Sequence, residues 1–123
     1  MKHILFLLCF VLLAILDSFA QFANISITTN TLDQSEPTIA VSPLNSNNIL
    51  SAWNDFRVGF SKSGYAFSIN NGANWTEKIL TPPVNYTNGF DPSIAYDRYN
   101  NIFYCYIAST GVLGPFMFQE QRI

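Results

Sequence analysis

Apolar, aromatic and β-branched residues gather in short runs along this chain, and turn-forming residues separate the runs. In the first half of the chain this pattern predicts four strands, near residues 37–42, 48–54, 63–69 and 74–80. After the apolar stretch at the N-terminus, no segment carries apolar residues at helical spacing. The pattern therefore predicts an all-β fold.

The chain also repeats itself. Glu-Pro-Thr-Ile-Ala-Val at 36–41 recurs as Asp-Pro-Ser-Ile-Ala-Tyr at 91–96, and Asn-Asn-Ile-Leu at 47–50 recurs as Asn-Asn-Ile-Phe at 100–103. The offset is 55 residues for the first block and 53 for the second. A period of this length has room for four short strands and their turns, so we expect two copies of one sheet unit.

A tight turn is predicted between the third and fourth strands, at Ser68-Ile-Asn-Asn-Gly-Ala-Asn-Trp75. The side chain of Asn70 is suited to accept hydrogen bonds from nearby backbone amides, and Gly72 relieves the steric strain of the turn. We expect the Trp75 ring to pack beneath it. A generic hairpin with an Asn-Gly turn is the alternative.

Ser68, Asn70, Gly72 and Trp75 match the Asp-box pattern Ser-x-Asp-x-Gly-x-x-Trp, with Asn70 where Asp is usual. Together with the repeat, they make the chain resemble the sialidase-like β-propellers, or bacterial neuraminidase repeat proteins. The resemblance implies a fragment of about one and a half blades, with a first blade over 36–90 and an incomplete second blade over 91–123. A propeller closes with roughly four to eight blades. We therefore expect an N-terminal fragment whose partner is the remainder of its own propeller.

Two alternatives to truncation stay open. Copies of the chain could assemble with one another. A free-standing β-sandwich of about 100 residues is the other alternative, since it needs about seven strands.

Each unit opens with an acid and a proline. We expect Pro37 and Pro92 at the opening residue of a strand, where a missing amide disturbs no ladder bond. Glu36 and Asp91 could accept hydrogen bonds from neighbouring groups, or they could line the central channel as functional acids. A structural role is favoured, because an acid that recurs in each unit is better explained by the unit than by a unique site.

The N-terminus predicts a secretory signal peptide over residues 1–20. Lys2 and His3 precede 13 apolar residues, Ile4 to Leu16, and small residues follow at 18 and 20. Thirteen residues are too few to span a bilayer, which needs roughly 20. We expect a secreted, extracellular protein (or a periplasmic or cell-surface one), without membrane attachment after cleavage. Residues 21–35 are predicted to form an N-terminal arm that can add an outer strand to a blade.

Cleavage after Ala20 narrows the chemistry of the remaining 103 residues, which contain no histidine. Ser-His-Asp catalysis, Cys-His catalysis and His-ligated zinc are therefore excluded within this segment, and we expect neither a metal nor a cofactor. Cys105 aligns with Ala52 of the first unit and is expected to be a buried thiol. Five basic and seven acidic residues, without a basic run, argue against nucleic acid as a partner.

The resemblance implies an arginine on the first strand that binds the carboxylate of sialic acid, but Glu36 stands there. The end of the second predicted strand is closer to the family pattern. Asp55 is the candidate catalytic acid, and Arg57 the candidate ligand-binding residue for an anionic or hydroxyl-rich ligand. The alternative is an exposed local ion pair worth under about 1 kcal/mol.

The sequence thus predicts a secreted sialidase-like Asp-box propeller that binds or hydrolyses glycans. If it is an enzyme, the resemblance implies a glycoside hydrolase of the exo-glycosidase type. A non-catalytic extracellular scaffold or adhesion propeller is the alternative function.

Overall fold

The computed structural model describes residues 24–111 and 116–122. The predicted signal peptide, residues 1–20, lies outside them. Within these ranges the chain forms seven strands and no helix: β1 (Gln34–Val41), β2 (Ile49–Asp55), β3 (Lys62–Ser68), β4 (Thr76–Ile79), β5 (Asn88–Tyr96), β6 (Ile102–Ser109) and β7 (Phe116–Arg122). The predicted all-β class is confirmed.

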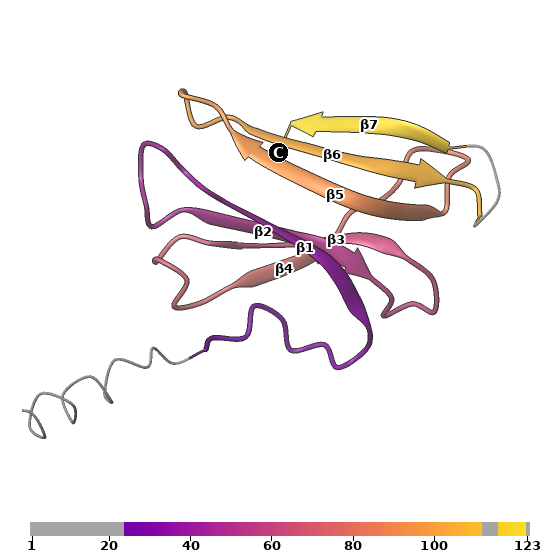
Figure 1. Ribbon diagram of the computed structural model, residues 1–123, viewed down its shortest axis with the longest axis horizontal. Coiled ribbons are helices and arrows are strands. Elements are labelled where there is room, and N and C mark those ends of the chain that lie inside the picture. The colour runs from indigo at the N-terminus through magenta and orange to yellow at the C-terminus, as the bar shows by residue number, and fades with distance from the viewer. Residues whose placement is uncertain (1–23, 112–115, 123) are drawn as a thin grey trace, which may run out of the picture.

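The strands form two antiparallel sheets in sequential order, β1-β2-β3-β4 (sheet 1) and β5-β6-β7 (sheet 2). Figure 1 shows the two sheets as stacked layers, with sheet 2 in orange and yellow above sheet 1. Neither sheet takes a strand from the other half of the chain. This meander differs from the Greek-key connections typical of immunoglobulin-like sandwiches.

The four strands predicted in the first half of the chain are confirmed, with bounds that differ by at most three residues. The arm behaves differently. Residues 24–33 form no strand, and β1 begins at Gln34. Instead of adding to a sheet edge, this arm crosses the face of sheet 1 that points away from sheet 2 (Figure 1).

The second unit contains a third strand, β7, which pairs with β6 along its whole length.

The sequence repeat is also a structural repeat. The register of β1 on β2 shifts between Ser35 and Thr38, and the register of β5 on β6 shifts between Phe90 and Ser93. Inside these bulges Glu36 and Asp91 have left-handed backbone angles, with φ of 54° and 49°.

We expected each of the two prolines to be the first residue of its strand, and this prediction is wrong. Pro37 and Pro92 lie within β1 and β5, inside the bulges. A bulge interrupts the ladder, so the missing amide of proline costs no ladder bond there.

The sheets pack front to back. Thr38 pairs with Ala52, and the equivalent Ser93 pairs with Cys105, so Ala52 and Cys105 are equivalent positions. We call the face of a sheet that carries these positions its front. The front of sheet 1 contributes Leu50 and Ala52 to the core. Sheet 2 meets it with Tyr104 and Tyr106, which alternate with Cys105 along β6 and therefore lie on its back.

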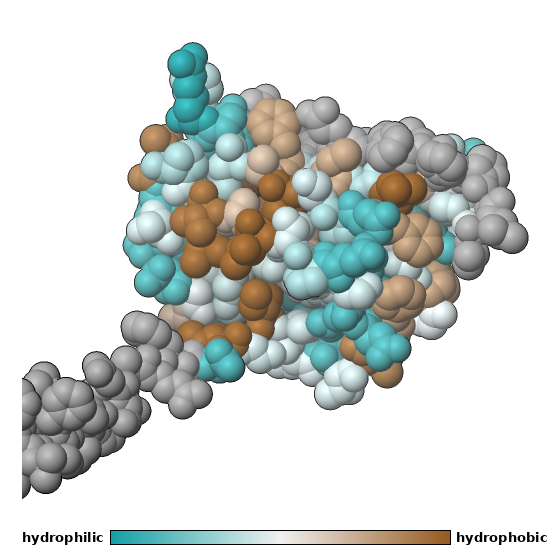
Figure 2. All heavy atoms as spheres, in the orientation of Figure 1, coloured by the Kyte–Doolittle hydropathy of each residue, from teal (hydrophilic) through white to brown (hydrophobic). Residues whose placement is uncertain are grey.

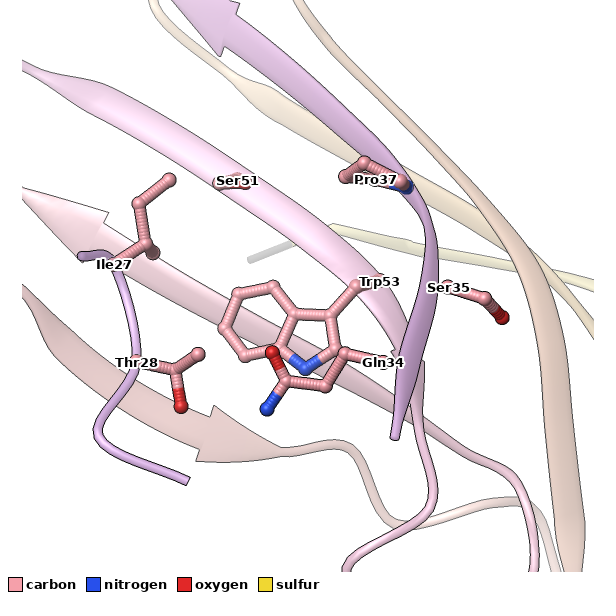
Figure 3. A pocket seen from close by; sticks show the side chains of 7 residues that line it. All are labelled: Ile27, Thr28, Gln34, Ser35, Pro37, Ser51 and Trp53. Carbon is pink, nitrogen blue, oxygen red and sulfur yellow. The ribbon is translucent and has the colours of Figure 1, made fainter. Parts of the chain in front are cut away.

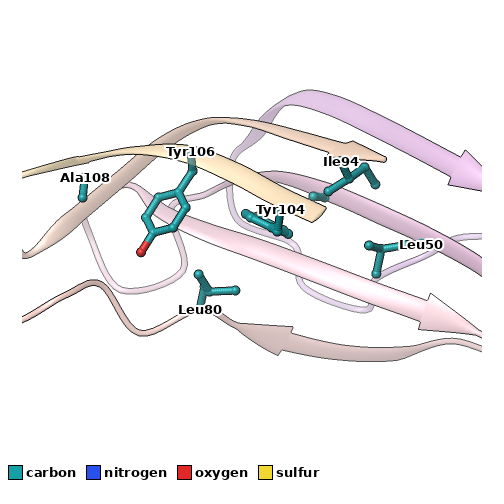
Figure 4. Close-up of a cluster of buried hydrophobic side chains, with 7 residues drawn as sticks. Leu50, Leu80, Ile94, Tyr104, Tyr106 and Ala108 are labelled. Carbon is teal, nitrogen blue, oxygen red and sulfur yellow. The ribbon is translucent and has the colours of Figure 1, made fainter. Parts of the chain in front are cut away.

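The core lies between the two sheets (Figure 4). Its buried members are Leu50, Ala52, Leu80, Ile94, Tyr104, Tyr106 and Ala108. Tyr104 is fully buried, makes edge-to-face contacts with Tyr65 and Tyr106, and donates a hydrogen bond to the carbonyl of Gly64 at 3.1 Å. A buried hydroxyl with a partner avoids the cost of an orphaned polar group, so Tyr104 joins the sheets without that penalty.

Cys105 is exposed, not buried as predicted. Its equivalent Ala52 is covered by sheet 2, whereas no described residue covers the front of sheet 2. Front-to-back packing leaves one front open, and Cys105 lies on it.

The turn at residues 68–75 joins β3 to β4 as predicted. Its hydrogen bonds come mainly from Ser68, whose hydroxyl accepts from the amide of Gly72 at 2.9 Å, while the side-chain oxygen of Asn70 accepts from the amide of Asn74 at 2.9 Å. Gly72 has a φ of 82°, and a Cβ there would lie 3.7 Å from the Trp75 ring. The ring thus packs against the turn, half-buried.

Hydrophobic residues also reach the surface. Figure 2 shows them gathered on the left of the visible face, where Figure 1 draws β1 and β2. Ile39 and Val41 of the edge strand β1 are 61% and 52% exposed. Exposed apolar side chains on a sheet edge form a surface suited to contact with another protein unit.

Candidate functional site

Asp55 and Arg57, the two candidate site residues from the sequence, lie together at the end of β2. Arg57 donates to Asp55 from Nε at 2.9 Å, from Nη2 at 2.6 Å and from its backbone amide at 3.0 Å. The Asp55 side chain is fully buried and that of Arg57 is 23% exposed. The pair is therefore not the exposed ion pair that the sequence alternative expected.

Two further residues complete this network. The Trp53 indole donates to Asp55 at 2.9 Å, and Arg57 also donates to Glu77 of β4 at 3.2 Å. Burial raises the pKa of Asp55, but the hydrogen bonds from Arg57 and Trp53 outweigh it, so the net shift is downward. Asp55 is thus held ionised, and the Arg57 charge is compensated by two carboxylates. In this arrangement both Asp55 oxygens accept hydrogen bonds, and a role for Asp55 as a general acid stays a prediction.

A second group of polar residues joins the two sheets. Asn54 donates to Glu36 at 2.9 Å and to Asp91 at 3.5 Å, while its side-chain oxygen accepts from the backbone amide of Asp91 at 2.8 Å. Glu36 and Asp91 are exposed and hydrogen-bond each other. That hydrogen bond and the negative charge of Asp91 raise the pKa of Glu36. We call Glu36 and Asp91 the acid pair. The hydrogen bond between them requires that one of the two carboxyl groups is protonated.

A pocket of about 230 Å³ opens between the arm and the back of sheet 1 (Figure 3). We call it the arm pocket, and it is lined by Ile27, Thr28, Gln34, Ser35, Pro37, Ser51 and Trp53. Figure 3 shows the Gln34 amide beside the Trp53 indole, with Thr28 of the arm on the opposite side. The amide nitrogen of Gln34 is buried and has no hydrogen-bond partner in the described part of the chain.

Among the described residues, no group of three or more His, Cys, Asp or Glu side chains is arranged to hold a metal ion. In the same residues no helix is long and apolar enough to cross a membrane.

No family model, curated protein or solved structure matches the chain.

Sequence reasoning found Asp55 and Arg57 but missed the groups around them. Alternation along β2 carries a signal for Trp53, since residues 51, 53 and 55 share one face of a strand. Gln34 and Glu77 reach the same face from β1 and β4, and no local pattern marks them. The register of the sheet brings them together.

Proposed function

We propose that this chain forms consecutive blades of a secreted sialidase-type β-propeller, and that the propeller binds or hydrolyses glycans through acids on its innermost strands. The observation that carries the proposal is the front-to-back packing of two units of one repeat, with Glu36 and Asp91 in contact across the joint. Repeated contacts of this heterologous kind form a ring when the rotation closes. Further sheets of the same propeller fit the open front of sheet 2.

The acid pair supports glycan recognition. In a propeller the first strand of each blade lines the central channel, and β1 and β5 are the first strands of their units. Both acids are exposed and sit at left-handed backbone positions, a strained geometry that clusters at ligand sites. Carboxylates accept hydrogen bonds from the hydroxyl groups of a sugar.

Binding is the activity that these residues support best. Glycosidases hold their two carboxyl groups roughly 5 Å or more apart, so that the sugar or a water fits between them. Glu36 and Asp91 are in direct hydrogen-bond contact, which leaves no such gap between them. Hydrolysis would need another carboxylate, supplied by a further blade.

The experiment is a glycan array and a panel of fluorogenic glycosides, both run with the secreted protein and with its E36Q/D91N variant. We expect the wild type to bind glycans and the double variant to bind fewer of them or to bind them more weakly. Asp33→Asn, an exposed carboxylate outside the pair, is the matched control and should bind like the wild type. Silence of the wild type on both screens would sink the glycan proposal.

The scaffold or adhesion function keeps one specific observation in its favour, the exposed apolar side chains of Ile39 and Val41 on edge strand β1. If the screens are silent, variants I39S and V41S test this function. Loss of a protein partner captured by the wild type would then support it.

A further inference from the structure

We infer that the arm pocket is a second binding site, separate from the acid pair, and that it takes the acetamido group of a neutral N-acetylhexosamine. The choice of a sugar as the carrier of this group rests on the proposed glycan function. The chemistry of the pocket itself comes from its lining residues.

The pocket holds an unused hydrogen-bond donor. Gln34 Nε2 is buried and has no hydrogen-bond partner among the described residues, and a buried amide without a partner is destabilising. Ser51, on the same wall, already donates to the carbonyl of Thr38 at 3.0 Å. The free donor therefore calls for an acceptor oxygen that a ligand brings.

The other walls are mainly apolar. Ile27, Pro37 and the Trp53 indole line them, and pockets of this kind bind an apolar group oriented by a few polar contacts. The volume of about 230 Å³ is below the roughly 300 to 1,000 Å³ of pockets for drug-sized ligands. A single substituent fits better than an extended chain. An acetamido group combines a carbonyl acceptor for Gln34 with a methyl group for the apolar wall.

Charge selects against an anionic sugar. The lining residues are uncharged, and the network next to Trp53 holds two carboxylates, Asp55 and Glu77, against the single positive charge of Arg57. A ligand carboxylate would meet a net negative field, and the lining residues listed above include no Lys or Arg to offset it. The pocket thus fits a neutral N-acetylated sugar better than a sialic acid.

The test follows the Trp53 indole N–H by NMR in the secreted protein. The chain has two tryptophans, so the Trp75 indole signal is an internal control and Trp75→Phe assigns the two peaks. We expect a saturable shift of the Trp53 peak with N-acetylglucosamine, little change with glucose, and weaker binding of N-acetylneuraminic acid. The Trp75 peak should stay in place.

Gln34→Leu separates a binding role from a structural one. It keeps the size of the side chain and removes the unpaired amide, so the melting temperature should stay or rise while the affinity falls about tenfold, as for one lost hydrogen bond. Val84→Ala, at a position 86% exposed, is the control and should change neither.

Three outcomes would overturn the inference: no saturable Trp53 shift, an equal response to glucose, or unchanged affinity in Gln34→Leu. The result is distinguishable from the array experiment. Array binding without a Trp53 response would contradict the binding role of the arm pocket and leave the acid-pair proposal intact. A Trp53 response from a protein that is silent on the array and on the glycosides sinks the acid-pair proposal alone.

Discussion

At the scale of single residues, the fold changes what Asp55 can do. The sequence presents an acid two residues before an arginine at a strand end, which is compatible with a catalytic pair. In the structure three donor groups of Arg57 and one of Trp53 hold the carboxylate in a buried site. A carboxylate so fully paired anchors the loop after β2 in place. The residues of the acid pair, by contrast, are exposed.

Replacing Asp55 tests the anchor. Asp55→Asn keeps the size and the Trp53 contact but leaves Arg57 with one carboxylate, and we expect a loss of about 3 kcal/mol in unfolding free energy, as when one partner of a buried pair is removed. Urea unfolding measures it. In an Arg57→Gln background the same change should cost clearly less. Equal losses in both backgrounds would show that the pair is uncoupled.

The acid pair and the Asp55–Arg57–Glu77 network predict pH dependences of folding stability that have opposite signs. The folded-state pKa of Glu36 is raised, so its contribution to stability is complete below the unfolded pKa of about 4.3 and is lost as the pH rises through the folded pKa. Glu36→Gln removes this loss. We expect its melting temperature to exceed that of the wild type at about pH 7 and the gain to shrink at about pH 4.

Glu77→Gln is the control for this pH effect. Hydrogen bonds from Thr28 and Arg57 lower the pKa of Glu77 despite its partial burial, so its stabilisation is present above the unfolded pKa and is lost as the pH falls. Thermal unfolding of this variant should show a deficit at about pH 7 that shrinks toward acid pH. A Glu36→Gln variant that melts below the wild type at about pH 7 would contradict the assignment.

At the scale of elements, β2 decides how the site and the core coexist. Its alternating side chains send Leu50 and Ala52 into the core between the sheets, and Ser51 and Trp53 into the arm pocket. The strand is therefore buried on both faces, by sheet 2 on the front and by the arm on the back. Opposite Trp53 stands Gly64 of β3, and its missing side chain leaves room for the indole and for Asp55.

Gly64→Ala tests this close approach. A Cβ at Gly64 would lie 2.8 Å from the Trp53 indole nitrogen and 3.0 Å from the Asp55 carboxylate, both held by hydrogen bonds. We expect a loss of about 1 to 3 kcal/mol in unfolding free energy, typical of an overpacked interior. Gly111→Ala, where no atom of the described residues lies within 4 Å, should change stability by less than about 0.5 kcal/mol. Equal effects of the two would contradict the packing argument.

At the scale of the whole molecule, front-to-back packing makes the two sheets unequal although they share one repeat. The back of sheet 1 is covered by the arm, its front by sheet 2, and the front of sheet 2 by no described residue. A sandwich uses one face of each sheet to close a core, whereas this packing leaves a front to which the same contact can be added again. That property supports the propeller that we propose over the free-standing sandwich.

Thiol reactivity measures the open front. In residues 21–123, whose single cysteine is Cys105, we expect a maleimide to alkylate Cys105 at a rate within about tenfold of a free thiol, because the side chain is exposed. In a Cys105→Ser background, Ala52→Cys at the equivalent covered position should react only on unfolding. If a further sheet of the proposed propeller covers the front in the protein from its native source, Cys105 should be protected there too. Equal reactivity at the two positions would contradict front-to-back packing.

The sequence by itself determined the four strands of the first half, the turn at 68–75 and the repeat, because periodicity, turn residues and internal similarity are local properties of the chain. It also marked Asp55 and Arg57, since their spacing at a strand end is local too. The tertiary structure decided that Asp55 is buried, that Cys105 is exposed, that Pro37 and Pro92 sit in bulges, and that Gln34 meets Trp53. Each depends on which face of a sheet another element covers, and that choice is made by contacts between residues far apart in the chain.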